Sequence, residues 1–317
     1  MEAGEPGIPA VEARGPESET GSRRSVFRPE RSGWRAAWPY FLPAALLAAV
    51  FLAYPILGTL WTSLFRDVAF LPRGFAGAGN FLDLAADPGF RQAAVFTALF
   101  ALASVPLETA LGLAMALVLQ AGVPGRFWLR AAVLLPWAVP ATASARVFES
   151  IYQVHGGLAN AILLGLGFSD RPIAWLGSAP SAFAALVLAD AWKTAPFAAI
   201  LFLAGLASLP PDLHRQARVD GAHFLQRFRL ITWPLLRPTL AVVVLFRAVD
   251  ALRVFDLNYT LTGGGPGGAT TSLSLLAYRR YLAGDFGAGA AISVVLFLAA
   301  LLFAIPYARR VRGAEGP

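Results

Sequence analysis

The stretch AAWPYFLPAALLAAVFLAYPILGTLWTSLF, residues 36–65, contains thirty residues and no charge. The hydrocarbon core of a bilayer is about 30 Å thick, and a helix needs roughly 20 apolar residues to cross it. Two further runs have the same character, since residues 286–308 carry no charge and residues 92–125 carry only Glu108. Apolar runs of this length predict an all-α integral membrane protein.

The overall composition agrees with this class. Of the 317 residues, 57% are hydrophobic and 14% are charged, whereas about a quarter are charged in soluble domains. The chain has no cysteine, which excludes disulfides and thiolate metal sites, and its three histidines show no metal-ligand spacing. The net charge of +7 comes from cations beside the apolar runs, so membrane topology explains it and no nucleic-acid partner is expected.

The two terminal segments of the chain are expected to form tails outside the membrane. Residues 1–35 are rich in Gly, Pro, Glu, Ser and Arg, which predicts a disordered basic cytoplasmic tail. The first apolar run is too long and comes too late for a secretory signal, whose apolar region has about 7–15 residues, so we expect it to remain as an anchor helix. Residues 311–317 are expected to form a second, short cytoplasmic tail.

The hydrophobic pattern predicts six membrane crossings within one transmembrane domain, residues 36–310. The spans are placed at about residues 37–63, 92–121, 127–150, 180–207, 238–260 and 286–308. The third span contains two prolines and the fifth contains four charges, so the sequence signal for these two spans is weaker than for the other four. With both termini inside, the cytoplasmic segments hold sixteen arginines and the outer segments hold six, in agreement with the positive-inside rule.

The longest predicted cytoplasmic segment between spans, residues 208–237, carries five arginines. Pro210–Pro211 can start a helix, and Gly221 suits the left-handed position that ends one. A second helical piece is expected to follow, and Pro234 and Pro238 are expected to break the chain as it re-enters the bilayer. The residues alone leave open whether this loop docks a partner or only sets the topology.

Several motifs carry a resemblance to a known family. They read RQARVDGA at 215–222, FLQRF at 224–228, ITWPLLRP at 231–238, DAWKTAPF at 190–197 and FRAVDALRVFDLNYTLTGGGP at 246–266. In this combination and spacing they resemble the permease subunits of bacterial ABC importers, in the carbohydrate branch. The resemblance covers about residues 36–310 and implies the type I importer fold, with six transmembrane helices and cytoplasmic termini.

The resemblance also implies partners. The chain would pair with a second homologous permease and a dimer of ATP-binding subunits within the lipid of a bacterial plasma membrane, and an extracytoplasmic solute-binding protein would deliver a sugar. ATP and Mg would be bound by the ATPase, and no cofactor by this chain. The residues agree, because the single lysine, Lys193, lies in no phosphate-cradling G-x-x-x-x-G-K-[ST] loop. The chain is therefore expected to be a transport subunit and not an enzyme.

In the family this loop docks as a coupling helix into a cleft of the ATPase. The resemblance places the following residues at that contact: Asp212, Leu213, Arg215, Gln216, Ala217, Arg218, Val219, Asp220, Gly221, Ala222 and Phe224. Where the family usually has Glu-Ala, this chain has Arg215-Gln216. Arg215 cannot accept the contact that the glutamate makes with a basic residue, so we expect a different partner surface or another acid, such as Asp220, in that role.

Ionisable residues inside the spans are candidates for function, because a charge in a bilayer is costly. Asp190 and Lys193 share a helix face and either neutralise each other or meet the substrate. A ladder of alternating charge recurs every three residues at Arg247, Asp250, Arg253 and Asp256. The ladder either joins helices or lines a polar path for sugar hydroxyls, whereas Glu108 is expected to pack between helices. The candidates for the substrate pathway are Trp192, Lys193, Arg247, Asp250 and Arg253.

The cargo that the resemblance implies is trehalose, maltose or a related α-glucoside, and an importer of glycerol phosphate or another small polar solute is the alternative. A secondary carrier would need no ATPase and would often show paired hydropathy repeats, which are not evident. An enzyme acting on lipid-linked sugars would need an acidic or histidine cluster at a membrane face, and the sequence has none. The turn Gly263–Pro266 either approaches the binding protein or is a simple flexible turn.

Overall fold

The computed structural model describes residues 33–121 and 125–314. The chain divides into two units, residues 1–54 and 55–317. This boundary lies inside the first predicted span, beside a π-helical turn. The start of the transmembrane domain at residue 36 stays a prediction. Of the predicted tails at residues 1–35 and 311–317, residues 1–32 and 315–317 lie outside the described residues.

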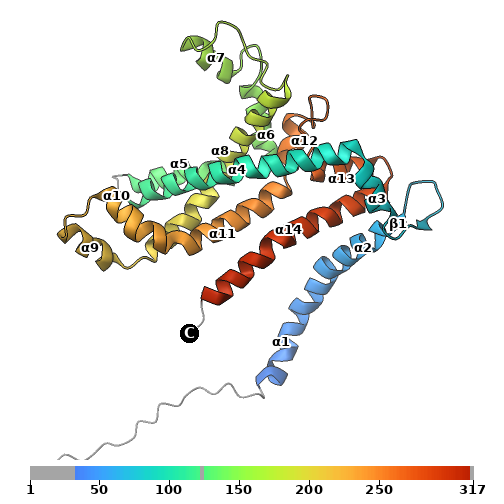
Figure 1. Cartoon of the computed structure of the whole chain (residues 1–317), viewed down its shortest axis with the longest axis horizontal. Helices are drawn as coiled ribbons and strands as arrows, with labels where there is room; N and C mark the ends of the chain where they lie inside the picture. Colours follow the sequence, from blue (N-terminus) through green and yellow to red (C-terminus); the bar gives the residue numbers. More distant parts are fainter. Residues whose placement is uncertain (1–32, 122–124, 315–317) are drawn as a thin grey trace, which may run out of the picture. The chain divides into compact units, whose positions relative to one another are not determined.

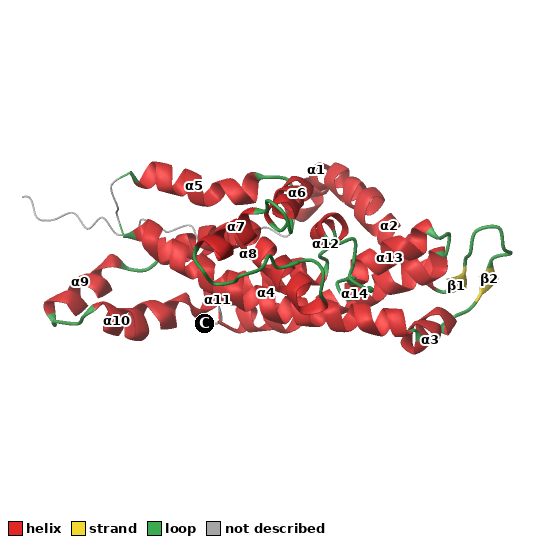
Figure 2. Cartoon of the chain, turned by 90° about the horizontal axis from the view of Figure 1, so that it is seen from above, coloured by secondary structure: helices red, strands yellow, loops and turns green. Residues whose placement is uncertain are grey.

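Apart from one short ribbon of two antiparallel strands, the elements of the described residues are helices (Figures 1 and 2). The N-terminal ones are α1 (Gly33–Ala48) and the π-helical turn η1 (Ala49–Ala53). The others are α2 (Tyr54–Ser63), β1 (Phe65–Arg66), β2 (Gly74–Phe75), α3 (Gly79–Ala86), α4 (Pro88–Gln120), α5 (Arg126–Ala138), α6 (Ala141–Ile151), α7 (Leu158–Gly165), α8 (Ala179–Ala207), α9 (Pro211–Val219), α10 (Phe224–Arg227), the π-helical turn η2 (Phe228–Thr232), α11 (Trp233–Leu252), α12 (Asp256–Leu261), α13 (Leu273–Leu282) and α14 (Phe286–Ala314).

Four of these helical stretches are long and apolar enough to cross a membrane. They are Trp38–Ser63, Pro88–Gln120, Ala179–Ala207 and Phe286–Ile305. The bent pair α5 and α6 makes a fifth candidate. α11 is not among them, because Arg237, Arg247 and Asp250 lie within its twenty residues, so a sixth crossing stays a prediction.

The third predicted span, residues 127–150, is not one straight helix. α5 ends at Ala138, α6 begins at Ala141, and the two helices are bent by 96°. The cause is Pro140, which has no N–H group and disfavours helical backbone at the residue before it. Val139 accordingly takes an extended conformation, with φ −71° and ψ 134°.

Contrary to the prediction, Pro234 and Pro238 do not break the chain. The helix runs without interruption over residues 224–252. Its segment Phe228–Thr232 is π-helical, and the backbone N–H group that follows bonds five residues back along the chain. Pro234 follows this wider turn directly, as the second residue of α11.

The fifth predicted span, residues 238–260, ends earlier than expected. α11 stops at Leu252, and the separate helix α12 starts at Asp256. The carbonyl oxygen of Val254, at the break, accepts a hydrogen bond of 2.7 Å from the hydroxyl of Ser272. A tertiary hydrogen bond therefore replaces a helical one, and Asp256 does not continue the charge ladder on α11.

α8 is the most buried of the four long apolar stretches, with 61% of its apolar window buried against 22% for α14. Half of its fourteen buried residues are alanines, and small residues let transmembrane helices approach closely. A Cβ atom added to Gly112 of α4 would lie 2.5 Å from the Cβ of Ala198. One added to Gly205 would lie 2.4 Å from the hydroxyl of Thr239 in α11. α4 and α11 therefore pack tightly on α8.

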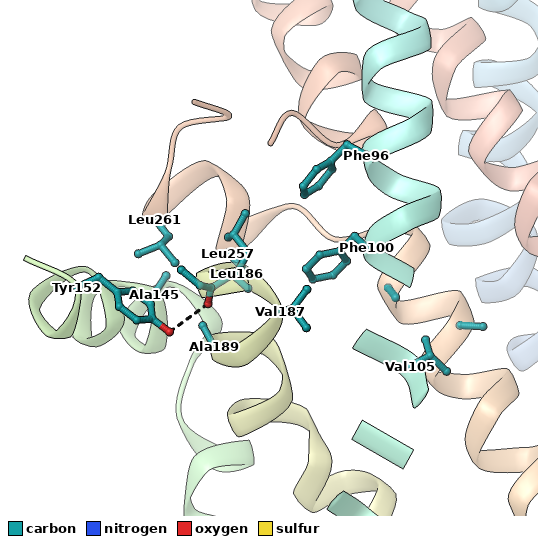
Figure 3. Close-up of a cluster of buried hydrophobic side chains, with 13 residues drawn as sticks. Phe96, Phe100, Val105, Ala145, Tyr152, Leu186, Val187, Ala189, Leu257 and Leu261 are labelled. Atoms are coloured by element: carbon teal, nitrogen blue, oxygen red, sulfur yellow. Dashed lines mark hydrogen bonds between the residues drawn. The ribbon is translucent and has the colours of Figure 1, made fainter. Parts of the chain in front are cut away.

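A cluster of apolar side chains holds α4, α6, α8 and α12 together (Figure 3). Phe100 of α4, Leu186 of α8 and Leu257 of α12 are among its buried members. Tyr152, at the end of α6, donates its hydroxyl to the carbonyl of Ala185 at 3.2 Å, the dashed line in Figure 3. Within the second unit, α9 and α10 lie at one end of the long helices and α3 with the strands at the other, in both Figure 1 and Figure 2.

Candidate functional site

The predicted cytoplasmic loop folds as a short helix that is closed by a glycine corner. Gly221 follows α9 with a φ of 78°. Its N–H group bonds to the carbonyl of Arg218 at 3.2 Å, and the N–H group of Ala222 bonds to that of Ala217 at 2.8 Å. These two bonds form a Schellman motif, whose left-handed residue is usually glycine because glycine has no Cβ. The predicted arrangement of helix, glycine corner and second helix is confirmed.

The residues expected to contact an ATPase gather on this projecting segment. All eleven are exposed except Ala217 and Ala222, which are half-buried. The apolar side chains among them are open to solvent, and Val219 is 87% exposed and Phe224 64% exposed. Clustered exposed apolar side chains are typical of a surface that a partner covers.

Arg215, the departure from the family pattern, pairs within its own helix. Its Nη1 lies 3.2 Å from Oδ1 of Asp212, one turn earlier. Both side chains are largely exposed, so this pair contributes little to stability. Asp220, the acid expected as a substitute, caps the C-terminal end of α9 and is exposed.

Arg247 lies at the centre of a buried ion network that joins three helices. Its Nε lies 2.6 Å from Oε2 of Glu108 in α4, and its Nη1 lies 2.8 Å from Oδ2 of Asp250 in α11. Its Nη2 lies 3.7 Å from Oδ2 of Asp190 in α8. The side chains of Arg247 and Glu108 are 3% and 0% exposed. Buried charges need such partners, and the predicted packing role of Glu108 is confirmed.

The two ends of the charge ladder on α11 differ in environment. Arg247 is buried among its acids, which favours the joining of helices over a place on a polar path. Asp250 also lies 2.8 Å from Arg253, and the side chains of these two residues are 44% and 73% exposed. Polar atoms of Asp250 and Arg253 therefore remain accessible to a solute.

Asp190 and Lys193 do not neutralise each other, because each has a different partner. Asp190 faces Arg247, whereas Nζ of Lys193 donates a hydrogen bond of 2.5 Å to the carbonyl oxygen of Val139. That carbonyl lies at the break before Pro140, where no helical N–H group can reach it. Lys193 therefore satisfies a backbone group inside the apolar region, as irregular backbone at membrane depth requires.

The side chain of Trp192 is partly exposed, as expected of a residue that contacts a solute. It is 43% exposed, and its ring meets Phe148 edge to face with a centroid distance of 5.4 Å. The ring of Phe148 lies 5.7 Å from that of Tyr152, and the ring of Tyr152 lies 5.8 Å from that of Trp175, measured between centroids. Aromatic side chains with a few polar groups are typical of ligand sites. The sequence did not indicate Phe148, because only the unpredicted bend before α6 brings it to α8.

The turn Gly263–Pro266 is held by hydrogen bonds and is not a simple flexible turn. The hydroxyls of Thr262 and Thr270 lie 2.7 Å apart, and the hydroxyl of Thr271 donates to the carbonyl of Gly264 at 3.2 Å. The guanidinium of Arg279 donates to the carbonyl at the first glycine of the turn. Its predicted approach to a binding protein stays a prediction.

Comparison with known proteins agrees with these features. Residues 108–312 match the family model of the binding-protein-dependent transport system inner membrane component. Over 267 residues the chain is 50% identical to the trehalose/maltose transport system permease protein MalF of Thermococcus litoralis, which covers 84% of this chain and 90% of the relative. Over 284 residues it is 38% identical to the trehalose transport system permease protein SugA of Mycobacterium tuberculosis, which covers 88% and 87%.

A solved structure shares the fold. It is the crystal structure of a bacterial ABC transporter involved in the import of the acidic polysaccharide alginate. The TM-score is 0.77 at 22% sequence identity, and the match covers 90% of this chain and 99% of that chain. At this identity the likeness shows the fold, which is the all-α fold that the motifs implied.

Proposed function

The chain belongs to the family of binding-protein-dependent transport system inner membrane components, and from this premise we propose that it is a permease subunit of an ATP-driven sugar importer. Membership makes it a multi-pass, non-catalytic membrane subunit of an ABC transporter. The proposal adds that a separate ATPase hydrolyses ATP and docks on α9. The observation that carries it is α9 itself, an exposed helix with a fixed corner between two long helices.

The route from α9 into the membrane is short and stiff. α8 leads into α9, and α10, η2 and α11 form one continuous helix that leads away from it. Arg247 ties α11 to Glu108 of α4 and to Asp190 of α8. A displacement of α9 by a closing ATPase dimer would therefore move these helices together, and access to a central site would alternate between the two faces.

The proposed cargo is trehalose, maltose or a related α-glucoside. Support comes from the 50% identity to a trehalose/maltose permease and the 38% identity to a trehalose permease. Trp192 offers an aromatic face, and Asp250 and Arg253 offer accessible donors and acceptors for hydroxyl groups. These three residues are the proposed contacts, while Arg247 and Lys193 hold the helices that carry them.

The proposed assembly contains a second, homologous permease, a dimer of ATP-binding subunits that hold ATP and Mg, and an extracytoplasmic solute-binding protein. Both termini and α9 would lie in the cytoplasm. The sixteen-to-six arginine distribution supports this orientation, because cytoplasmic segments carry the excess of positive charge.

Uptake into proteoliposomes that contain the complete transporter tests the proposal. Accumulation of labelled trehalose or maltose is expected only with ATP inside and the binding protein outside. Labelled glycerol phosphate serves as the alternative cargo in the same vesicles. Uptake by this chain alone under a proton gradient, without ATP, would show a secondary carrier and contradict the proposal.

A further inference from the structure

A hollow of about 750 Å³ separates α9 and α10 from the ends of α4 and α8. Four basic side chains line it: His214, Arg215, Arg218 and Arg227. Leu206 and Phe228 are among its apolar lining residues, and no acidic side chain of the described residues lines it. The hollow is therefore basic on the side of α9 and α10 and apolar toward the long helices.

Its positive charge is only partly compensated. Arg215 pairs with Asp212, which lies outside the lining. The Nε of Arg218 donates to the carbonyl of His214 at 3.3 Å, which leaves the charge of the guanidinium unmatched. Within residues 33–121 and 125–314, neither Arg218 nor Arg227 forms an ion pair. Two guanidinium groups are thus available to an anion.

The hollow takes one face of α9, which includes Arg215 and Arg218 of the residues expected at the ATPase, and it leaves the opposite face of the helix to that contact. The lining residues of this helix are Pro211, His214, Arg215 and Arg218. Their spacing of three and four places them on one face of a helix, and Leu213, Gln216 and Asp220 fall on the opposite face. An ATPase can therefore cover the second face while the first remains turned toward the hollow.

We propose that this hollow binds the phosphate group of an anionic phospholipid. The proposal rests on the proposed cytoplasmic position of α9, which places the hollow at the membrane surface. Basic pockets between transmembrane helices on the cytoplasmic side bind anionic headgroups, and guanidinium groups match phosphate oxygens in pairs. The apolar lining gives the acyl chains a place beside α8 that a free phosphate would not use. Arg215, where the family usually has an acid, adds positive charge to the site.

The test uses the complete transporter in nanodiscs of phosphatidylcholine and phosphatidylglycerol, followed by native mass spectrometry of the retained lipids. The wild type is expected to retain phosphatidylglycerol, and Arg227→Gln to lower its retention about fivefold. Arg227→Lys keeps the charge and is expected to recover most of the retention. Arg229→Gln is the matched control, because Arg229 is exposed, lies two residues further along and does not line the hollow.

Equal retention by the wild type and Arg227→Gln would overturn the proposal. Displacement of the lipid by millimolar inorganic phosphate would also overturn it and assign the hollow to a free anion, and retention of the lipid only after the ATPase subunits are stripped from the complex would assign it to an acidic segment of that partner. ATP hydrolysis stimulated by the binding protein is measured in the same complexes. If ATP hydrolysis is still stimulated while Arg227→Gln retains as much phosphatidylglycerol as the wild type, the proposed importer function is supported and only the proposed lipid site is contradicted.

Discussion

At the scale of single residues, Arg247 joins α4, α8 and α11, because its guanidinium contacts an acid on each of these helices. Arg247→Met leaves Glu108 and Asp190 buried without their cation. Breaking a buried pair in this way is expected to lower the free energy of unfolding by about 3–5 kcal/mol. Thermal unfolding of the purified, detergent-solubilised complex measures the loss.

Two further variants separate the buried pair from general effects of charge. Arg253→Gln removes an exposed partner of Asp250 and is expected to cost about 1 kcal/mol or less. The double variant Arg247→Met with Glu108→Leu removes both buried charges and should recover part of the lost stability. Equal losses for Arg247→Met and Arg253→Gln would contradict the role assigned to the network.

Lys193 gives the second prediction at this scale. Lys193→Met leaves the Val139 carbonyl without its donor, which is expected to lower stability by about 1–3 kcal/mol while the KM for sugar stays unchanged. Trp192→Ala is the contrasting variant, and its KM is expected to rise because a proposed sugar contact is lost. A raised KM with unchanged stability for Lys193→Met would place the amine on the substrate instead.

At the scale of elements, the sequence predicts what depends on local residues and misses what depends on distant partners. The uncharged runs and the glycine after α9 are local signals, and the corresponding helices and corner are confirmed. The bend at Pro140 and the continuous helix through Pro234 depend on which group satisfies the freed backbone. Lys193 bonds to the Val139 carbonyl at the bend, and the π-helical turn η2 directly precedes α11 and Pro234, and neither arrangement can be recognised before the fold is known.

Close packing of α4 on α8 is tested at Gly112. Gly112→Val places a side chain where even a Cβ atom would lie 2.5 Å from Ala198, and it is expected to cost about 1–3 kcal/mol. Gly58→Val is the matched control, because Gly58 is also helical and has no atom within 4 Å of an added Cβ. The yield and the melting temperature of the complex report both changes, and similar losses at the two glycines would argue against a tight contact.

The corner after α9 is tested at Gly221. Gly221→Pro cannot reach a φ of 78° and removes the N–H group that bonds to Arg218, so hydrolysis of ATP coupled to transport should be lost while membrane insertion remains. Gly221→Asn tolerates the left-handed conformation and is expected to keep most of the activity. Undiminished stimulated hydrolysis in Gly221→Pro would mean that the corner does not position the coupling helix.

At the scale of the whole molecule, the motifs identified the family, because they combine positions from spans and loops that lie far apart in the sequence. They did not show that α8, with its alanine-rich face, is the most buried of the long apolar helices, since that follows from packing. Arg247, one of the charges that lower the hydropathy of the fifth span, is the residue that joins it to α4 and α8. A hydropathy criterion therefore counts against α11 a residue that holds the helix in place.

The central claim is that α9 docks on a separate ATPase subunit. Its most direct test is a cross-link from the face of α9 that lies opposite the hollow. The chain has no cysteine, so Gln216→Cys introduces a single thiol on that face, and Leu71→Cys introduces one in the exposed loop between β1 and β2 at the other end of the second unit. In the assembled transporter, the thiol at position 216 is expected to cross-link to the ATPase subunit, and the thiol at position 71 is not. Labelling of position 216 by an impermeant reagent added outside intact cells, with no cross-link to the ATPase, would contradict the account.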